Sequence, residues 1–531
     1  MSKRSARRAR KKAALLAERR DTHAAGIDPI HGVWREGIAP KNVATWRRDV
    51  DRHVRTPVVA FTLTAVFWLL VGTTFALIAS FKFQYPDWLG ETAAMTFGRV
   101  RPAHLNTMIW GWISPAGVAI AIWLWGRLLK TEVRHVWALN VSVVLWNIGV
   151  LIGTIGILAG YSQGIEWVEM PVAAFVFLVP ALLLVAYSLL STLRHRRVAH
   201  LYISVWYIGA SLLWTPVLIV AILLPIYSGV PHATANWWFA HNILGLWLTP
   251  IGLGAAYYLI PKVVGRPIYS YHLSYLGFWT LALFYNWAGV HHLVGGPPPQ
   301  WVVTVSIVFS VMMIIPVIIV GLNHHMTAFP RIKRVIWSPT LRFVVFGAVS
   351  YTVVSLQGAL QALRFWQEVT HFTHYTIAHS HIGVYAFVTM IAYGALYYLL
   401  PRVTGWEWKS KRLISLHFWT AAVGISLYII GLTVGGVFQG LMMNNPDVPF
   451  MDVVEFMKPF LWSRSIAGVL MTIGHIVFAY LVWEIVRKKG ERPPGPVFLR
   501  QPPPGVYRMM TGADPEQGDG SMGHATPSPA A

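Results

Sequence analysis

Long apolar runs recur along most of this chain, and they restrict its fold more than any other feature of the sequence. Between Val58 and residue 486, twelve runs are each long enough to cross a hydrocarbon layer about 30 Å thick. The sequence therefore predicts an all-α integral membrane protein with twelve transmembrane helices. The predicted spans are 58–80, 103–126, 136–160, 171–193, 201–227, 236–260, 273–293, 301–322, 343–366, 376–400, 413–440 and 460–486.

The charge of the connecting loops alternates along the chain. Loops after the even-numbered spans carry sixteen Lys and Arg residues, whereas loops after the odd-numbered spans carry only four. Basic loops stay in the cytoplasm, so both termini are expected there. The net charge of +22 lies in these loops and near the N-terminus, a distribution that fits a membrane surface. We therefore expect membrane lipid, and no nucleic acid, as a partner.

The two ends of the chain differ from the apolar middle, which spans residues 58–486. Residues 1–57 form a basic cytoplasmic extension, with fifteen Lys and Arg against six acidic residues among the first 55. Residues 487–531 contain nine prolines and little apolar content, so we expect a largely disordered cytoplasmic tail. The N-terminal segment lacks the short apolar core of a secretory signal.

Two histidines at the start of the tenth span, His379 and His381, suggest a cofactor on each side of one helix. Residues two apart on an α-helix point about 200° apart, so these imidazoles cannot share one metal. Histidine is the usual axial ligand of haem iron, which makes two flanking haems the first hypothesis. A hydrogen-bonded pair of interfacial histidines is the alternative. The chain has no cysteine, so any metal must be held by histidine or oxygen.

Four further histidines, His104, His241, His291 and His292, lie at the same outer depth of the predicted spans. Imidazoles in a membrane need partners, which argues against a coincidence. Adjacent residues on a helix are about 100° apart, so His291 and His292 can approach one metal together with His241. Three neutral imidazoles suit copper, zinc or iron. The alternative for the adjacent pair is a helix end capped by polar side chains.

Hydroxyl groups on the seventh span suggest a proton path. Tyr285 precedes His292 by two helical turns and Ser274 precedes Tyr285 by three, so all three are expected on one face. Hydroxyls also occur as ordinary packing residues in membrane helices. The middles of the twelve spans contain no acidic residue, so protons would travel along hydroxyls, imidazoles and water.

Four motifs in order resemble the catalytic subunit of the haem-copper oxidases, most closely the C-type or cbb-type cytochrome c oxidases. They are Arg-Val-Arg-Pro-Ala-His at 99–104, Trp-Trp-Phe-Ala-His-Asn at 237–242, Tyr-Asn-Trp-Ala-Gly-Val-His-His at 285–292 and Tyr-Thr-Ile-Ala-His-Ser-His at 375–381. The resemblance covers residues 58–486. It implies a terminal respiratory oxidase of the bacterial cytoplasmic (inner) membrane, reducing dioxygen to water and coupled to proton uptake.

The resemblance also implies cofactors. His104 and His381 look like the axial ligands of a low-spin haem b, and His379 like the proximal ligand of a high-spin haem b. The copper ligands would be His241, His291 and His292.

Other residues are matched to roles only by this resemblance. Tyr285 corresponds to the family's catalytic tyrosine, which is cross-linked to the first copper ligand. Arg101 and Trp237 are similar to residues near the haem propionates. Thr249, Tyr257 and Ser274 are similar to members of the single proton channel. Electrons would arrive from cytochrome c through subunits that contain haem c.

The chain departs from the family pattern at Gln357, where a glutamate is usual, and at His374, where an aspartate is frequent. The nearest rival function is nitric oxide reduction, in which the second metal is iron and acidic residues surround it. Tyr285 and the absence of a nearby glutamate favour dioxygen reduction over nitric oxide reduction. A twelve-helix secondary transporter is a rival of another class. Transporters tend to have broken helices at the midplane, whereas the polar residues here cluster at one outer depth.

Overall fold

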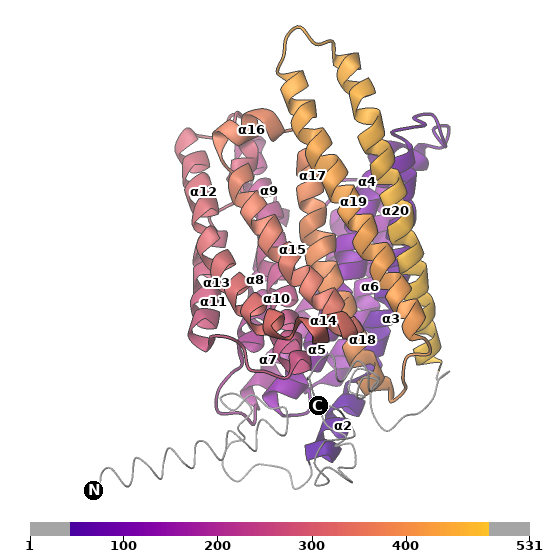
Figure 1. The fold of residues 1–531 in the computed structure, drawn as a ribbon, viewed down its shortest axis with the longest axis vertical. Coiled ribbons are helices and arrows are strands. Elements are labelled where there is room, and N and C mark those ends of the chain that lie inside the picture. The colour runs from indigo at the N-terminus through magenta and orange to yellow at the C-terminus, as the bar shows by residue number, and fades with distance from the viewer. Residues whose placement is uncertain (1–42, 488–531) are drawn as a thin grey trace, which may run out of the picture.

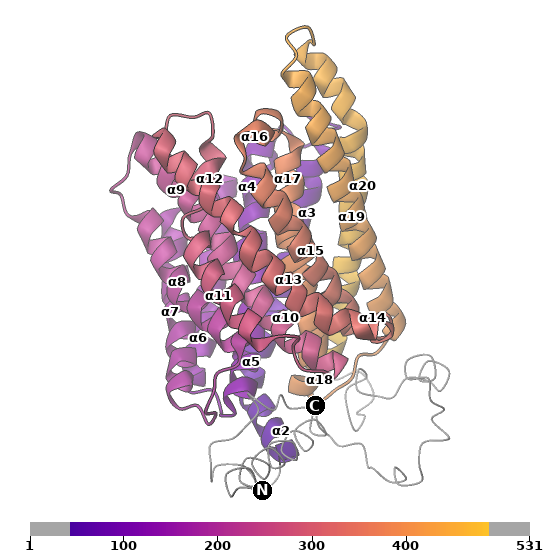
Figure 2. The same cartoon turned by 60° about the vertical axis from the view of Figure 1, so that its left-hand side comes forward.

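Helices make up the regular structure of the computed structural model, which describes residues 43–487 (Figures 1 and 2). The all-α prediction is thereby confirmed. The α-helices are α2 Val43–His53, α3 Arg55–Phe81, α4 Phe97–Asn106, α5 Ser114–Leu129, α6 Val136–Ala159, α7 Val172–Arg194, α8 Ile203–Leu223, α9 Gly229–Ile243, α10 Thr249–Val264, α11 Tyr271–Tyr285, α12 Gln300–Met312, α13 Ile314–Ala328, α14 Ile332–Trp337, α15 Pro339–Gln361, α16 Arg364–Thr370, α17 His374–His381, α18 Met390–Thr404, α19 Lys411–Met443 and α20 Phe450–Val486.

Shorter segments of other helical types interrupt this series. Three are π-helical, η2 Thr107–Ile113, η3 Leu244–Leu248 and η6 Ile382–Thr389. Three are single 3₁₀ turns, η1 Ala93–Met95, η4 Val290–Leu293 and η5 Phe329–Arg331.

Eleven of the twelve predicted spans correspond to continuous helical segments long and apolar enough to cross a membrane within residues 43–487. The exception is the predicted span 273–293. Here α11 covers only 15 residues and ends at Tyr285. The chain then turns through Gly289, whose φ of 114° is in the region that favours glycine, before the turn η4. His292 is therefore not on the helix of Tyr285, and the predicted two-turn relation between them is wrong.

Three spans form the centre of the bundle. In Phe97–Leu129, Gly229–Val264 and His374–Thr404, 94%, 83% and 89% of the most apolar window is buried, against 28–56% in the other spans. Each central span contains one of the π-helical segments. The remaining helices surround them and expose apolar side chains outward, as expected of a surface that faces lipid.

The bundle has two distinguishable ends (Figures 1 and 2). The end that carries α2 and α14, together with the basic loops after α5, α7, α10 and α18, is called the inner end. The opposite end, with α16 and the turn between α19 and α20, is called the outer end. The basic residues of 1–42 and the predicted tail beyond residue 487 lie outside the described residues.

Helix α2 belongs to the predicted N-terminal extension and packs against the inner end of the bundle. Its buried Asp51 accepts hydrogen bonds from Arg127 Nε at 2.8 Å and from Trp123 Nε1 at 2.9 Å, both on α5. A buried charge is costly unless paired, so this ion pair attaches α2 to a central span.

Candidate haem and metal sites

Two cavities lie on opposite sides of α17 and η6. His379 lines the first cavity and His381 lines the second. Their separation by two residues on a helix produces this arrangement, as the sequence predicts. Six residues line both cavities: Arg101, Glu166, Trp167, Ile377, Ser380 and Val384.

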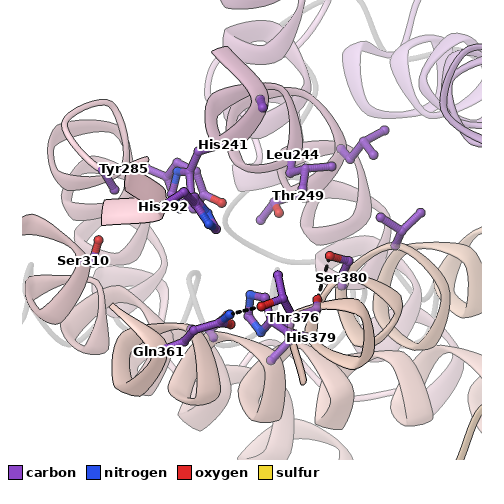
Figure 3. A pocket seen from close by; sticks show the side chains of 18 of the residues that line it. His241, Leu244, Thr249, Tyr285, His292, Ser310, Gln361, Thr376, His379 and Ser380 are labelled. Atoms are coloured by element: carbon purple, nitrogen blue, oxygen red, sulfur yellow. Dashed lines mark hydrogen bonds between the residues drawn. The ribbon is translucent and has the colours of Figure 1, made fainter. Parts of the chain in front are cut away.

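The first cavity brings together three imidazoles from two elements (Figure 3). His241 on α9 and His291 and His292 on η4 each place one ring nitrogen so that the three atoms lie within 4.8 Å of one another. His379 lies across the same cavity. The three-histidine set fits a small metal ion of the copper or zinc kind, which these three residues would hold on the side of the cavity that faces His379.

A backbone turn that requires glycine positions the two adjacent histidines. A Cβ atom at Gly289 would lie 2.7 Å from the Trp237 carbonyl oxygen and 2.9 Å from His241 Cβ. The turn thus lets η4 approach α9 closely. His291 is fixed further by Ser310 Oγ, 2.9 Å from its Nδ1, and Ser306 Oγ accepts a hydrogen bond from its backbone N–H at 3.0 Å.

Tyr285 reaches the cluster from the end of α11. Its ring stacks on that of His241, with centroids 4.4 Å apart and planes 29° apart. Gly245, one turn after His241, leaves the room for this ring, because a Cβ there would lie 1.8 Å from Tyr285 Cζ. Tyr285 therefore lines the first cavity beside His241, although the predicted stripe through His292 does not exist.

His379 is held from behind by α15. Its Nδ1 lies 3.2 Å from Gln357 Oε1, and a Cβ at Gly358 would lie 3.0 Å from its Cε1. An amide oxygen can only accept, so Nδ1 carries the proton and Nε2 is free to bind a metal. Gln357, the departure from the family pattern, thus contacts a proposed haem ligand with a neutral acceptor.

The second cavity lies between His104 on α4 and His381. His104 Nδ1 donates to the carbonyl oxygen of Gly72 at 3.0 Å, and His381 Nδ1 donates to that of Ile377 at 2.8 Å. Because carbonyl oxygens accept only, both imidazoles present an unprotonated Nε2. Two such nitrogens suit a haem iron whose axial positions are both filled.

Charged residues gather at the outer end of both cavities. Arg101 Nη2 lies 3.4 Å from Glu166 Oε1, and both side chains are partly exposed. Trp237 stacks on His292 with ring centroids 4.5 Å apart, so it supports the three-histidine cluster as well as lining the first cavity. Arg101 borders both cavities, a place from which it could neutralise carboxylate groups of bound haem.

A buried carboxyl group next to these sites is not evident from the sequence. Glu169, in the loop between α6 and α7, accepts a hydrogen bond from Asn106 Nδ2 at 2.7 Å, and Asn106 is two residues from His104. Burial raises the pKa of Glu169 to about 7, and the charge of Glu166 adds to this rise. The fold of the loop buries Glu169 and sets it against Asn106, which is 63 residues away in the sequence.

The three proposed proton-path residues lie toward the inner side of the first cavity. Thr249 lines the cavity itself (Figure 3). Further from it, Asn323 Nδ2 donates to Ser274 Oγ at 3.1 Å and contacts Tyr257 Oη at 3.4 Å. Asn323 on α13 thus joins the two side chains, which the sequence alone did not connect.

Comparisons with known proteins give a consistent family. The family model described as "Cytochrome C and Quinol oxidase polypeptide I" matches residues 56–470. The chain is 32% identical to "Cbb3-type cytochrome c oxidase subunit CcoN1" of Stutzerimonas stutzeri, over 80% of this chain and 94% of that protein. A nitric oxide reductase subunit of the same organism is more distant, at 26% identity over 46% of this chain and 54% of that protein.

A solved structure has the same fold. It is a heme-copper terminal oxidase dimer determined by cryo-EM, with a TM-score of 0.61, 18% sequence identity and coverage of 82% of this chain and 84% of that chain. From the matched family model and the similarity to the CcoN1 subunit, we conclude that this chain belongs to the haem-copper oxidase subunit I family, on its cbb3-type branch.

Proposed function

We propose that this chain is the catalytic subunit of a terminal oxidase that reduces dioxygen to water with electrons from cytochrome c. The observation that carries the proposal is the first cavity, where three imidazoles face His379 and Tyr285 stacks on one of them. The donor sets fit a copper ion at His241, His291 and His292 and a high-spin haem b at His379. They also fit a low-spin haem b between His104 and His381. When bound, these groups would supply the electron transfer that dioxygen reduction needs.

The chain's own side chains would orient the reacting groups and deliver protons. Gln357 and Gly358 fix the ring of His379, and Gly289 and Ser310 fix His291. Tyr285 places a phenol beside His241, from which a proton and an electron can be drawn. The family resemblance implies a covalent bond between Tyr285 and His241, and the neighbouring positions of the two rings make this bond part of the proposal.

Protons for the first cavity would enter from the inner end. Ser274, Asn323 and Tyr257 form a connected polar group below the cavity, and Thr249 lies at its wall. Hydroxyl groups and amides can pass protons with intervening water, and no acidic side chain is needed.

The membrane orientation and partners belong to the same proposal. The basic inner end would face the cytoplasm of a bacterium, across its inner membrane. Electrons would enter at the outer end from haem c-containing subunits, close to the low-spin site. Dioxygen would be the substrate.

Nitric oxide reduction is the competing function. This reaction joins two nitric oxide molecules with only two electrons. It therefore does not need an additional electron from a phenol beside the second metal. Tyr285 next to His241 favours dioxygen reduction.

The substitution Tyr285→Phe tests the proposed function, because it removes one hydroxyl and keeps the packing of the ring. Dioxygen turnover by the complete oxidase should fall by about 100-fold or more, as when a group acting in proton transfer is lost. Haem and metal content should stay unchanged. Tyr275→Phe is the matched control, since its hydroxyl, on the same helix, bonds the Leu201 carbonyl away from the cavity. Normal turnover of Tyr285→Phe with full metal content would contradict the proposal.

A further inference from the structure

A second group of buried polar side chains begins at the inner side of the second cavity. His475 on α20 lies between Thr73 on α3 and Tyr385 on η6, with Nδ1 2.6 Å from Thr73 Oγ1 and Nε2 2.9 Å from Tyr385 Oη. All three side chains line the cavity of His104 and His381. None of them belongs to the proton path proposed above.

The partners of His475 differ in kind from those of the proposed haem ligands. His104 and His381 each donate to a carbonyl oxygen, which fixes one protonation state. His475 has a hydroxyl at both ring nitrogens, and a hydroxyl can either donate or accept. The site therefore satisfies the neutral imidazole, and it equally satisfies the imidazolium, in which both nitrogens donate.

The polar group continues toward the inner end through α18 and α19. The hydroxyl of Tyr393 faces that of Tyr385. The Tyr393 ring contacts His417, with centroids 4.4 Å apart, and His417 Nδ1 lies 2.8 Å from Tyr397 Oη. Two buried atoms at this junction, Tyr393 Oη and His417 Nε2, lack a well-formed hydrogen bond within the described chain. Buried polar atoms of this kind are commonly satisfied by ordered water.

The group ends near the inner surface. Tyr397 precedes the last residue of α18 by seven positions, and His417 follows the first residue of α19 by six, roughly 10 Å of helix in each case. Buried Glu407 lies in the loop between these two helices. The polar side chains thus extend from the second cavity to within about two helical turns of the basic loops.

An internal repeat relates this group to the proton path of the first cavity. Residues 251–280 and 391–420 can be aligned with a constant offset of 140, and both contain Tyr-Tyr-Leu-x-Pro and Phe-Trp-Thr. Within this alignment Tyr257 corresponds to Tyr397, and the same offset relates two further pairs outside it, His241 to His381 and Thr249 to Thr389. Thr249 lines the first cavity and Thr389 the second. Tyr397 thus occupies, in the second repeat, the sequence position that Tyr257 occupies in the first.

We propose that the side chains from Tyr397 to His475 form a second proton route, which leads to the low-spin haem cavity and not to the site of dioxygen reduction. The proposal rests on the proposed function, because it assumes a haem between His104 and His381. With a haem held there, a one-electron reduction of its iron would be accompanied by uptake of one proton, which would convert the His475 imidazole to imidazolium. The net charge of the buried cavity then stays constant, which lowers the cost of the electron in a medium of low dielectric constant.

Few titratable or charged side chains near His475 could accept this proton in its place. The titratable side chains that face it are Tyr385 on η6, Tyr393 on α18, His417 on α19 and His104 on α4. Among the residues that line the cavity, the charged side chains are Arg101, Glu166 and Arg464, which lie toward its outer end.

The test uses the complete oxidase in lipid vesicles, with the first cavity blocked by cyanide so that dioxygen reduction consumes no protons. In the parent enzyme, rapid reduction of the low-spin haem should be followed by proton uptake from the inner side, and its midpoint potential should fall as pH rises. Tyr397→Phe should slow this uptake on the order of tenfold. His475→Asn should flatten the dependence of the potential on pH, and Tyr385→Phe provides a milder change at the same site.

Tyr398→Phe is the matched control, because Tyr398 is the next residue of α18 and its buried hydroxyl has no hydrogen bond within the described chain. It should take up protons like the parent. Ser274→Ala, in the other path, should also leave this uptake unchanged. A parent without proton uptake, or a Tyr397→Phe variant with the parental rate, would overturn the second route alone. A parent without a low-spin haem spectrum would instead overturn the proposed function.

Discussion

The hydrogen bonds behind the proposed haem ligands divide them into two kinds. His104 and His381 donate to backbone carbonyl oxygens of Gly72 and Ile377, whereas His379 donates to a side chain, Gln357. A backbone acceptor cannot be changed by substitution, but a side-chain acceptor can tune the electron density of the ligand. Of the three proposed ligands, His379 is therefore the one whose hydrogen-bond acceptor a single substitution can replace.

Separate substitution of His379 and His381 should give opposite spectral losses, because the two side chains face different cavities. His381→Ala should remove the low-spin haem signal and retain high-spin character, and His379→Ala should do the reverse. Reduced-minus-oxidised absorption spectra of the purified variants measure both signals. Equal loss of one component in both variants would mean that α17 does not separate two haems.

Residue types and spacing predict that the six histidines gather, because imidazoles at one membrane depth need partners. The structure places them around two cavities, and their role as metal and haem ligands stays a prediction. The same reasoning could not find Asn323 or Glu169. Asn323 joins Ser274 to Tyr257 from another helix, and Glu169 is buried by the fold of a loop. Both roles depend on contacts between segments far apart in the sequence.

At the scale of elements, each central span changes helical type just after its histidine. The π-helical segments begin at Thr107, Leu244 and Ile382, three residues after His104, His241 and His379 respectively. π-Helical turns are frequent at functional sites, where they reorient the side chains next to them. Apolar periodicity predicts the spans but not these turns, since tertiary packing decides their place.

The close approach of α9 and η3 to α11 depends on Gly245. In Gly245→Ala the new Cβ would lie 1.8 Å from Tyr285 Cζ, so the ring must leave its position on His241. We expect overpacking to cost about 1–3 kcal/mol of stability, and dioxygen turnover to fall as in Tyr285→Phe. Oxygen consumption and thermal unfolding of the purified oxidase measure the two effects.

Gly209→Ala on α8 is the control, because its Cβ would meet only the Trp125 ring at 3.4 Å, an acceptable contact. A Gly245→Ala variant with parental turnover would show that the placement of Tyr285 against His241 is not required.

At the scale of the whole molecule, sequence predicts the bundle better than its irregular parts. Eleven predicted spans correspond to long helices within residues 43–487, since length and hydropathy are sufficient to identify them. The exception is the seventh predicted span, 273–293, where α11 ends at Tyr285 and the chain turns at Gly289. This turn brings His291 and His292 to His241. The arrangement of helices around two cavities also needed the three-dimensional structure.

The orientation of the bundle gives a further prediction. Reporter domains fused after Arg197 and Arg334 should be cytoplasmic, and one fused near Gly296 should be external, because the basic loops gather at the inner end. Activity of a reporter that works on only one side of the membrane measures this in whole cells. Cytoplasmic activity of the reporter at Gly296 would contradict this orientation, because it would mean that the histidine clusters lie toward the cytoplasm.

The central claim is that one helix separates a closed haem site from an open haem site that faces a copper ion. Metal analysis of the purified protein, combined with its reduced-minus-oxidised spectrum, tests this most directly. The account predicts two b-type haems and one copper per copy of this chain, with one low-spin and one high-spin component. A non-haem iron in place of copper, or a single haem, would contradict it.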